Sequence, residues 1–137
     1  MIEAVQRRFT KYLPGLFDLT YEDRLAVLEL ECLEVRRIRA DLCLTYKFCH
    51  NMLQLKFEDF FEFNNNCTRG HRFKLKKKHA RTNINKNVFS FRVVNIWNSL
   101  SPDIVDALLM TFKKKLSGSI NLNEYCKGIA RDMARER

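Results

Sequence analysis

The sequence predicts a mostly α-helical fold of about five helices with one small, basic β-hairpin. Only two prolines and four glycines interrupt 137 residues, which favours helices over a many-turned β-sandwich. Apolar residues recur at helical spacing through most of the chain, whereas one segment alternates apolar and basic residues as an amphipathic strand does. At 46% hydrophobic, with eleven Phe, the chain has enough apolar surface to bury a core.

The N-terminal part predicts two helices, over residues 2–13 and about 21–29. The first has apolar residues at i, i+3 and i+4 spacing. Thr20 is placed to cap the second helix, which is expected to bury Leu25 and Leu28. The apolar face of the first helix consists of Ile2, Val5, Phe9 and Leu13.

The longest predicted helix runs from about residue 33 to residue 53 and is the expected spine of the fold. At 1.5 Å per residue it would span roughly 30 Å, the width of a small domain. Its expected buried stripe is Val35, Ile38, Leu42, Tyr46, Cys49 and Leu53.

The middle of the chain contains the strand signals. Residues 57–63 suit a short helix, although 61–63 alternates as a strand does. Residues 71–76 alternate with Phe73 and Leu75 on one side and basic residues on the other. We expect residues 82–86 to be the antiparallel partner of this strand, which would make a basic hairpin.

The C-terminal part predicts two further helices, over about 87–100 and 102–116. The second begins at Ser101-Pro102, with Ser as N-cap and Pro at the first helical position. We therefore expect residues 1–116 to form a single helical domain and 117–137 to be a tail or an extra helix. The expected inward residues are Phe89, Val93, Ile96 or Trp97, and Leu100 in the first, and Ile104, Val105, Leu108, Leu109, Phe112 and Leu116 in the second.

The charge of the chain is concentrated in one stretch, residues 63–102. This stretch contains no Asp or Glu and nine Lys or Arg, which equals the formal net charge of +9. The remainder balances, with 16 basic residues against 16 acidic ones. Because a concentrated field of one sign attracts polyanions, RNA or DNA is the predicted partner, although a merely solvated basic face is the alternative. The basic residues are Arg69, Arg72, Lys74, Lys76, Lys77, Lys78, Arg81, Lys86 and Arg92.

The aromatic residues between these charges have two possible roles. Phe73, Phe89 and Phe91 could stack on bases, but their spacing favours positions in the core.

No catalytic or metal-binding motif is recognisable in the sequence. A nucleophile elbow, a Gly-rich phosphate loop and a His-Glu-x-x-His motif are all missing, and the adjacent acidic pairs are best explained as solvated faces. The five cysteines are odd in number and contain no Cys-x-x-Cys pair, so we predict no metal and no cofactor. Reduced thiols are typical of an intracellular protein, cytoplasmic or nuclear. We expect no membrane span and no secretory signal.

Several motifs occur in an order that resembles a known family. They are "VQRRFTKYLPGL", "YEDRLAVLEL", "LEVRRIRADLCLTYKF", "TRGHRFKL", "RTNINKNVFSFRVVNIWNSLSPDIV" and "FKKKL". Together they resemble the C-terminal region of LINE-type, non-LTR retrotransposon reverse transcriptases of the jockey-like group. The resemblance covers about residues 2–116, and the tail from Ser117 departs from it.

The resemblance implies a module that follows the polymerase and thumb and helps to hold template RNA or target DNA. The catalytic Tyr-x-Asp-Asp motif of the family is missing here, so no catalytic residue is carried over. Met1 directly precedes a family motif, which leads us to expect either a truncated element or a gene-model fragment. The positions carried over as candidate contacts are Arg7, Arg8, Arg36, Arg37, Arg69, His71 and Arg92.

The leading hypothesis is therefore a nucleic-acid-binding fragment of a retrotransposon RNA-directed DNA polymerase, inactive by itself. The first alternative is a protein-interaction module whose apolar helices dock on the polymerase and thumb. The second is a non-functional remnant of a mobile element.

Overall fold

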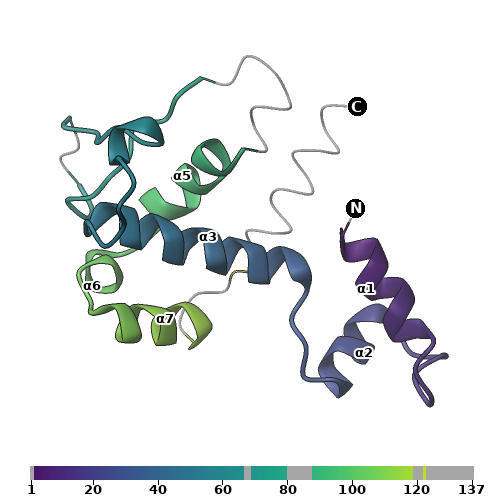
Figure 1. Ribbon diagram of the computed structural model, residues 1–137. Coiled ribbons are helices and arrows are strands. Elements are labelled where there is room, and N and C mark those ends of the chain that lie inside the picture. Colours follow the sequence, from purple (N-terminus) through teal and green to yellow (C-terminus); the bar gives the residue numbers. More distant parts are fainter. Residues whose placement is uncertain (1, 67–68, 80–87, 119–121, 123–137) are drawn as a thin grey trace. The chain divides into compact units, whose positions relative to one another are not determined.

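The chain folds mostly into α-helices, as seen in a computed structural model that describes residues 2–66, 69–79, 88–118 and 122 (Figure 1). Six α-helices and one short 3-10 helix, η1, form within these residues. The mostly helical class predicted from the sequence is thus confirmed. In chain order the elements are α1 (Ile2–Lys11), α2 (Tyr21–Val27), α3 (Leu33–Cys49), η1 (Phe57–Asp59), α5 (Phe89–Ser99), α6 (Pro102–Val105) and α7 (Leu109–Gly118).

The chain divides into two compact units, Met1–Ile38 and Arg39–Arg137. The boundary falls within α3, whereas the sequence placed residues 1–116 in one helical domain. Of the predicted tail, residues 117–137, only Ser117, Gly118 and Leu122 are among the described residues, and Leu122 is buried.

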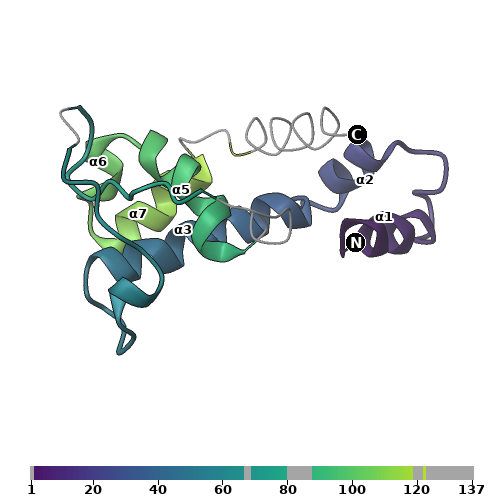
Figure 2. The same cartoon turned by 90° about the horizontal axis from the view of Figure 1, so that it is seen from above.

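In the first unit α1 and α2 pack side by side (Figures 1 and 2). The predicted N-cap of α2 is confirmed, because the Thr20 hydroxyl accepts a hydrogen bond of 3.2 Å from the Asp23 N–H. Such a cap satisfies one of the N–H groups that the first turn of a helix leaves unpaired. The cap therefore fixes where α2 begins.

The contact between α1 and α2 is polar at its centre. The Arg24 side chain is buried, and its Nε donates to the Thr10 hydroxyl at 3.2 Å. Its two terminal nitrogens donate to the Leu19 carbonyl at 2.7 Å and to the Arg7 carbonyl at 3.4 Å. One guanidinium thus ties α1, the loop that follows and α2 together.

This arrangement overturns the predicted apolar face of α1. Val5 and Phe9 are 69% and 65% exposed, whereas Thr10 is fully buried. The helix turns Thr10 toward α2 because Arg24 needs an acceptor there, and Val5 and Phe9 then face solvent. In α2 the expected Leu25 and Leu28 are only half-buried.

Glu3 joins three parts of the first unit. Its carboxylate accepts a hydrogen bond from the Tyr21 hydroxyl and another, of 2.9 Å, from the N–H of Leu33. Leu33 is the first residue of α3, so a side chain of α1 satisfies a free N–H at the start of another helix. Burial, and then the hydrogen bond to Glu3, raises the pKa of Tyr21.

The predicted buried stripe of α3 is present. The helix ends at Cys49, earlier than expected, because Asn51 adopts a positive φ of 52° and the Met52 N–H returns to the Lys47 carbonyl at 2.9 Å. Leu53 therefore lies beyond the helix and is half-buried. The buried members of the stripe are Val35, Ile38, Leu42, Tyr46 and Cys49.

The single helix predicted over residues 102–116 is broken into α6 and α7. The Tyr46 hydroxyl donates to the Ala107 carbonyl at 2.6 Å, and His50 Nε2 lies 3.2 Å from the Val105 carbonyl. Tyr46 of α3 and His50, the residue that follows this helix, thus supply partners for carbonyls at the break, where helical hydrogen bonding is interrupted. Leu108 lies in the break and is 80% exposed, contrary to the prediction.

The small basic hairpin is not seen within the described residues. Its proposed second strand, residues 82–86, lies outside them. Instead Leu75 forms an isolated antiparallel bridge with Phe63. The Asn64 N–H donates to the Lys74 carbonyl at 2.8 Å, and the Lys76 N–H donates to the Glu62 carbonyl at 2.7 Å.

The extended backbone of residues 73–76 is held on its other side by α5. The Trp97 Nε1–H donates to the Phe73 carbonyl at 2.8 Å. The Asn98 side chain makes two hydrogen bonds with Leu75: its amide donates to the carbonyl and its oxygen accepts from the N–H, both at 2.8 Å. Trp97 itself is fully buried and contacts Phe112, so the segment is fixed to the core of the second unit.

The replacement Asn98→Ala tests this attachment. It removes both hydrogen bonds and leaves the Leu75 backbone without partners in a buried setting, so we expect a loss of about 1–3 kcal/mol in the free energy of unfolding. Asn95→Ala is the matched control, because Asn95 is exposed on the same helix. Urea unfolding measures both variants, and equal losses would contradict the role given to Asn98.

Candidate nucleic-acid interface

The basic segment, residues 71–78, presents its charges on the side away from α5. His71 and Leu75 are 3% and 1% exposed, and Phe73 is half-buried. Arg72 and Lys76 between them are exposed, Lys74 is half-buried, and Lys77 and Lys78 continue the exposed run. The alternation predicted for residues 71–76 is thus present, although its partner strand is a different one.

Two acidic residues lie next to this face. Lys76 Nζ pairs with a Glu62 carboxylate oxygen at 2.7 Å, and this hydrogen bond lowers the pKa of Glu62. Arg72 Nε lies 3.4 Å from an Asp106 carboxylate oxygen. Both carboxylates come from outside the acid-free stretch, one just before it and one after it. The fold therefore places partners beside charges that the sequence leaves unopposed.

Lys77 and Lys78 are the basic residues of the segment that remain most available. Both are exposed, and neither forms an ion pair with a carboxylate of the described part of the chain. The backbone just before them, residues 73–76, is held on both sides, by residues 62–64 and by α5. A pair of exposed lysines that adjoins a held backbone can contact phosphates with little ordering of the chain.

Gly70 immediately precedes the basic segment and leaves room for the Lys74 side chain. It has a φ of +99°, a conformation that costs other residues free energy. A Cβ at this position would lie 2.5 Å from Cε of Lys74. The Lys74 side chain thus lies directly over a residue without a side chain, which accounts for its half-buried state.

Two candidate contacts, buried His71 and half-buried Arg92, are bound to other parts of the second unit. His71 Nε2 lies 3.0 Å from the Trp97 carbonyl, and the ring packs edge-on against the indole. Arg92 makes a two-pronged ion pair with Asp41, at 2.7 and 2.8 Å, and so joins α5 to the second-unit part of α3. These positions suit a structural role, so we leave both residues outside the proposed contact surface.

The remaining candidates are distributed over the chain. In the first unit Arg7 is exposed and lies over the Tyr21 ring at 4.8 Å. Arg69, in the second unit, is exposed. Arg81 and Lys86 lie outside the described residues. The other exposed candidates of the first unit are Arg8, Arg36 and Arg37.

The interleaved phenylalanines lie at the core. Phe89 is half-buried and its ring lies 5.4 Å from that of Phe61 and 6.4 Å from that of Phe48. Phe91 is also half-buried. The residue that sequence reasoning missed is Asn98, whose polarity on an otherwise apolar helix face was the signal of its contact with Leu75.

The cysteines within the described residues are Cys32, Cys43 and Cys49, all free. Burial raises the pKa of Cys49 to about 12, so this thiol stays protonated. The part of the chain that the structure describes contains no group of three or more His, Cys, Asp or Glu residues placed to hold a metal ion. It also contains no helix with the length and hydropathy needed to span a membrane.

Comparison with family models, with characterised proteins and with solved structures finds no match for this chain. The candidate interface therefore rests on its own geometry.

The pH dependence of stability tests the buried position of His71. Burial lowers the pKa of its imidazole below the ordinary value of about 6.5, so the unfolded chain binds the proton more tightly. The contribution of His71 to the free energy of unfolding is therefore largest above about pH 6.5, and it is lost as the pH drops from there toward the pKa of His71 in the folded state. We expect His71→Gln, which keeps a donor for the Trp97 carbonyl, to lose less stability than the wild type between about pH 7.5 and about pH 5.

His79→Gln is the control for this measurement, because His79 is exposed. It should lose as much stability over this pH range as the wild type. If His71→Gln did the same in urea unfolding, His71 would not be the titrating group.

Proposed function

We propose that this chain binds RNA or DNA through the exposed lysines of the basic segment, as the C-terminal module of a retrotransposon reverse transcriptase. In this function it supports the binding of template or target and carries out no polymerisation itself. The observation that carries the proposal is the pair Lys77 and Lys78. Both are exposed, and neither forms an ion pair within the described residues. They directly follow a stretch of backbone, residues 73–76, that is held at two edges. The resemblance to the jockey-like group supports the assignment to this position in the polymerase.

The chemistry of such a surface is electrostatic. Lysines that contact phosphates release condensed counterions, so affinity falls with rising salt and depends little on base sequence. Exposed neutral groups such as Asn64 and Asn65 lie in the loop before the segment and can add hydrogen bonds to phosphate oxygens. We therefore expect broad recognition of nucleic acid in which the backbone, and not base identity, supplies the affinity.

Charge reversal at the basic segment tests the proposal. The double variant Lys77→Glu with Lys78→Glu should raise Kd for RNA or duplex DNA by about tenfold or more, and should lower the slope of log K against log salt by about two. Fluorescence anisotropy between about 50 and 200 mM salt measures both quantities.

The matched control is Lys113→Glu with Lys114→Glu, two exposed lysines of α7 that give the same change in net charge. If both double variants weakened the affinity for nucleic acid equally, the effect would depend on net charge alone and not on the basic segment. A flat salt response of the wild type would also contradict a phosphate-binding surface.

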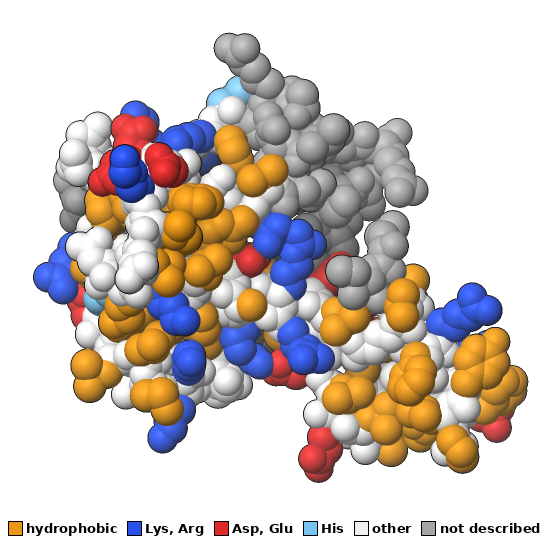
Figure 3. All heavy atoms as spheres, viewed as in Figure 1, with side chains coloured by type: hydrophobic (Ala, Val, Ile, Leu, Met, Phe, Trp, Pro, Cys, Tyr) orange, Lys and Arg blue, Asp and Glu red, His pale blue; other side chains and the backbone are white. Residues whose placement is uncertain are grey.

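A second candidate function is favoured by the exposed apolar side chains of the first unit. Val5, Phe9 and Val27 are each more than 60% exposed, and Figure 3 shows hydrophobic side chains gathered on the face of α1 and α2. Exposed apolar patches of this kind mark interaction sites. The partner that the family resemblance implies is the preceding polymerase and thumb, so the chain would be a docking module.

Self-association of the isolated chain tests the docking surface. We expect the chain to form concentration-dependent oligomers in size-exclusion chromatography with light scattering, because exposed apolar side chains favour association. Val5→Gln with Phe9→Gln should shift the chain to the monomer, whereas Arg8→Gln on the same helix should not. A wild-type chain that stays monomeric at high concentration would count against docking.

A further inference from the structure

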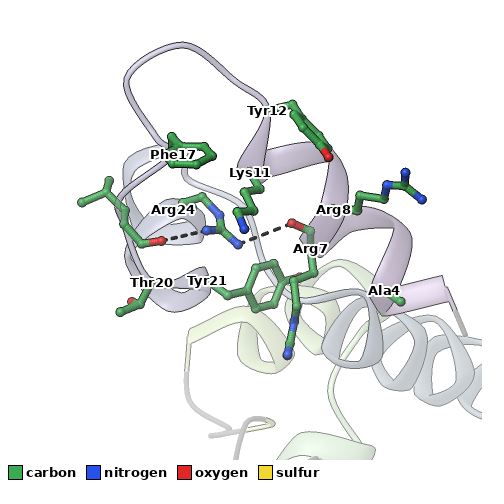
Figure 4. A pocket seen from close by; sticks show the side chains of 10 residues that line it. Ala4, Arg7, Arg8, Lys11, Tyr12, Phe17, Thr20, Tyr21 and Arg24 are labelled. Carbon is green, nitrogen blue, oxygen red and sulfur yellow. Dashed lines mark hydrogen bonds between the residues drawn. The ribbon is translucent and has the colours of Figure 1, made fainter.

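The first unit contains an open pocket of about 650 Å³ between α1, the loop that follows it and the start of α2 (Figure 4). Pockets for small ligands have roughly this size, 300–1,000 Å³. Its lining includes four basic residues, three aromatic ones and no Asp or Glu. The residues that line it are Ala4, Arg7, Arg8, Lys11, Tyr12, Phe17, Leu19, Thr20, Tyr21 and Arg24.

In the part of the chain that the structure describes, the basic residues of this pocket are not opposed by a carboxylate. Arg24 is 5% exposed, and its hydrogen bonds all go to neutral oxygens, those of Thr10, Leu19 and Arg7. Within the described residues no carboxylate forms an ion pair with Arg24, Arg7 or Lys11. A buried charge without a counter-charge costs free energy, which an anion bound in the pocket would offset.

The aromatic residues lie beside these cations. Figure 4 shows Arg24 at the centre of the pocket with Lys11 pointing toward it, while Arg8 points away. Lys11 Nζ lies 5.4 Å from the centre of the Phe17 ring, and the Arg7 guanidinium lies 4.8 Å from that of Tyr21. Tyr12 and Phe17 are 72% and 64% exposed, so their rings are open to a planar ligand.

We propose that this pocket binds one nucleotide unit, an aromatic base with its phosphate, with the phosphate near Lys11 and Arg24 and the base stacked on Tyr12 or Phe17. This combination of cations and exposed rings is the one that holds unpaired nucleotides, because a base must leave its duplex before a ring can stack on it. The inference goes beyond the proposed function, since it concerns another unit and requires an unpaired base. The nucleotide unit belongs either to a single strand or to a free nucleotide.

The test uses the full chain, AMP as the probe and amide chemical shifts as the readout. AMP should shift the amides of the first unit, and Tyr12→Ala with Phe17→Ala should raise its Kd by about tenfold, the usual effect of losing a stacking ring. Tyr12→Phe, which keeps the ring, should stay close to the wild type. The control is Phe9→Ala, because Phe9 is an equally exposed aromatic residue of α1 outside the pocket lining.

Two results would overturn the proposal. One is unchanged AMP affinity in the variant that lacks both rings. The other is that inorganic phosphate shifts the same amides as much as AMP does at equal concentration, which would show that the base does not contribute to binding. A short single-stranded oligonucleotide identifies the source: competition with AMP points to a strand, and its absence points to a free nucleotide, each with the site itself upheld. The variant Lys77→Glu with Lys78→Glu should leave AMP binding intact, so the failure of either proposal is seen separately.

Discussion

The double hydrogen bond between the Asn98 side chain and the Leu75 backbone is the interaction on which the candidate interface depends. An extended segment next to a helix has no regular partner for its N–H and C=O groups, and burying them unpaired is costly. Asn98 provides a donor and an acceptor at one position, so it replaces a neighbouring strand for Leu75. Trp97 does the same for the Phe73 carbonyl. Because His71, Phe73 and Leu75 are held inward, the basic residues between them must face outward.

The helices could be predicted because their signals are local. Apolar spacing located the buried stripe of α3, and the Thr20 cap located the start of α2. The alternation at residues 71–76 also described the two faces of the basic segment. Its pairing with residues 62–64 could not be deduced, since alternation shows that a strand has two faces but does not identify its neighbour. The signal at residues 61–63 was present, but it competed with a helical interpretation.

The other misses have one cause, which is tertiary hydrogen bonding by polar side chains. Tyr46 supplies a partner for the Ala107 carbonyl at the break between α6 and α7, and Arg24 brings Thr10 into the interior of the first unit. Apolar periodicity assigns the inward face of a helix to its hydrophobic residues, so it cannot anticipate a buried threonine beside exposed Val5 and Phe9. The same limit explains why composition grouped Arg92 with the surface lysines, although its partly buried ion pair with Asp41 joins α5 to α3.

The cations of this chain therefore serve different purposes that composition cannot separate. Arg24 is buried and Arg92 is half-buried, and hydrogen bonds hold both side chains in place, whereas Lys77 and Lys78 are exposed and form no ion pair within the described residues. Like charges in a row repel one another; Glu62 and Asp106 oppose two of them at the surface, while Trp97, Asn98 and the burial of Leu75 fix the backbone. The backbone contacts and the exposed charge of Lys77 and Lys78 are consequently supplied by different residues. A surface built in this way can lose or reverse its exposed charges while the fold beneath it is kept, which makes its affinity for a polyanion measurable apart from its folding.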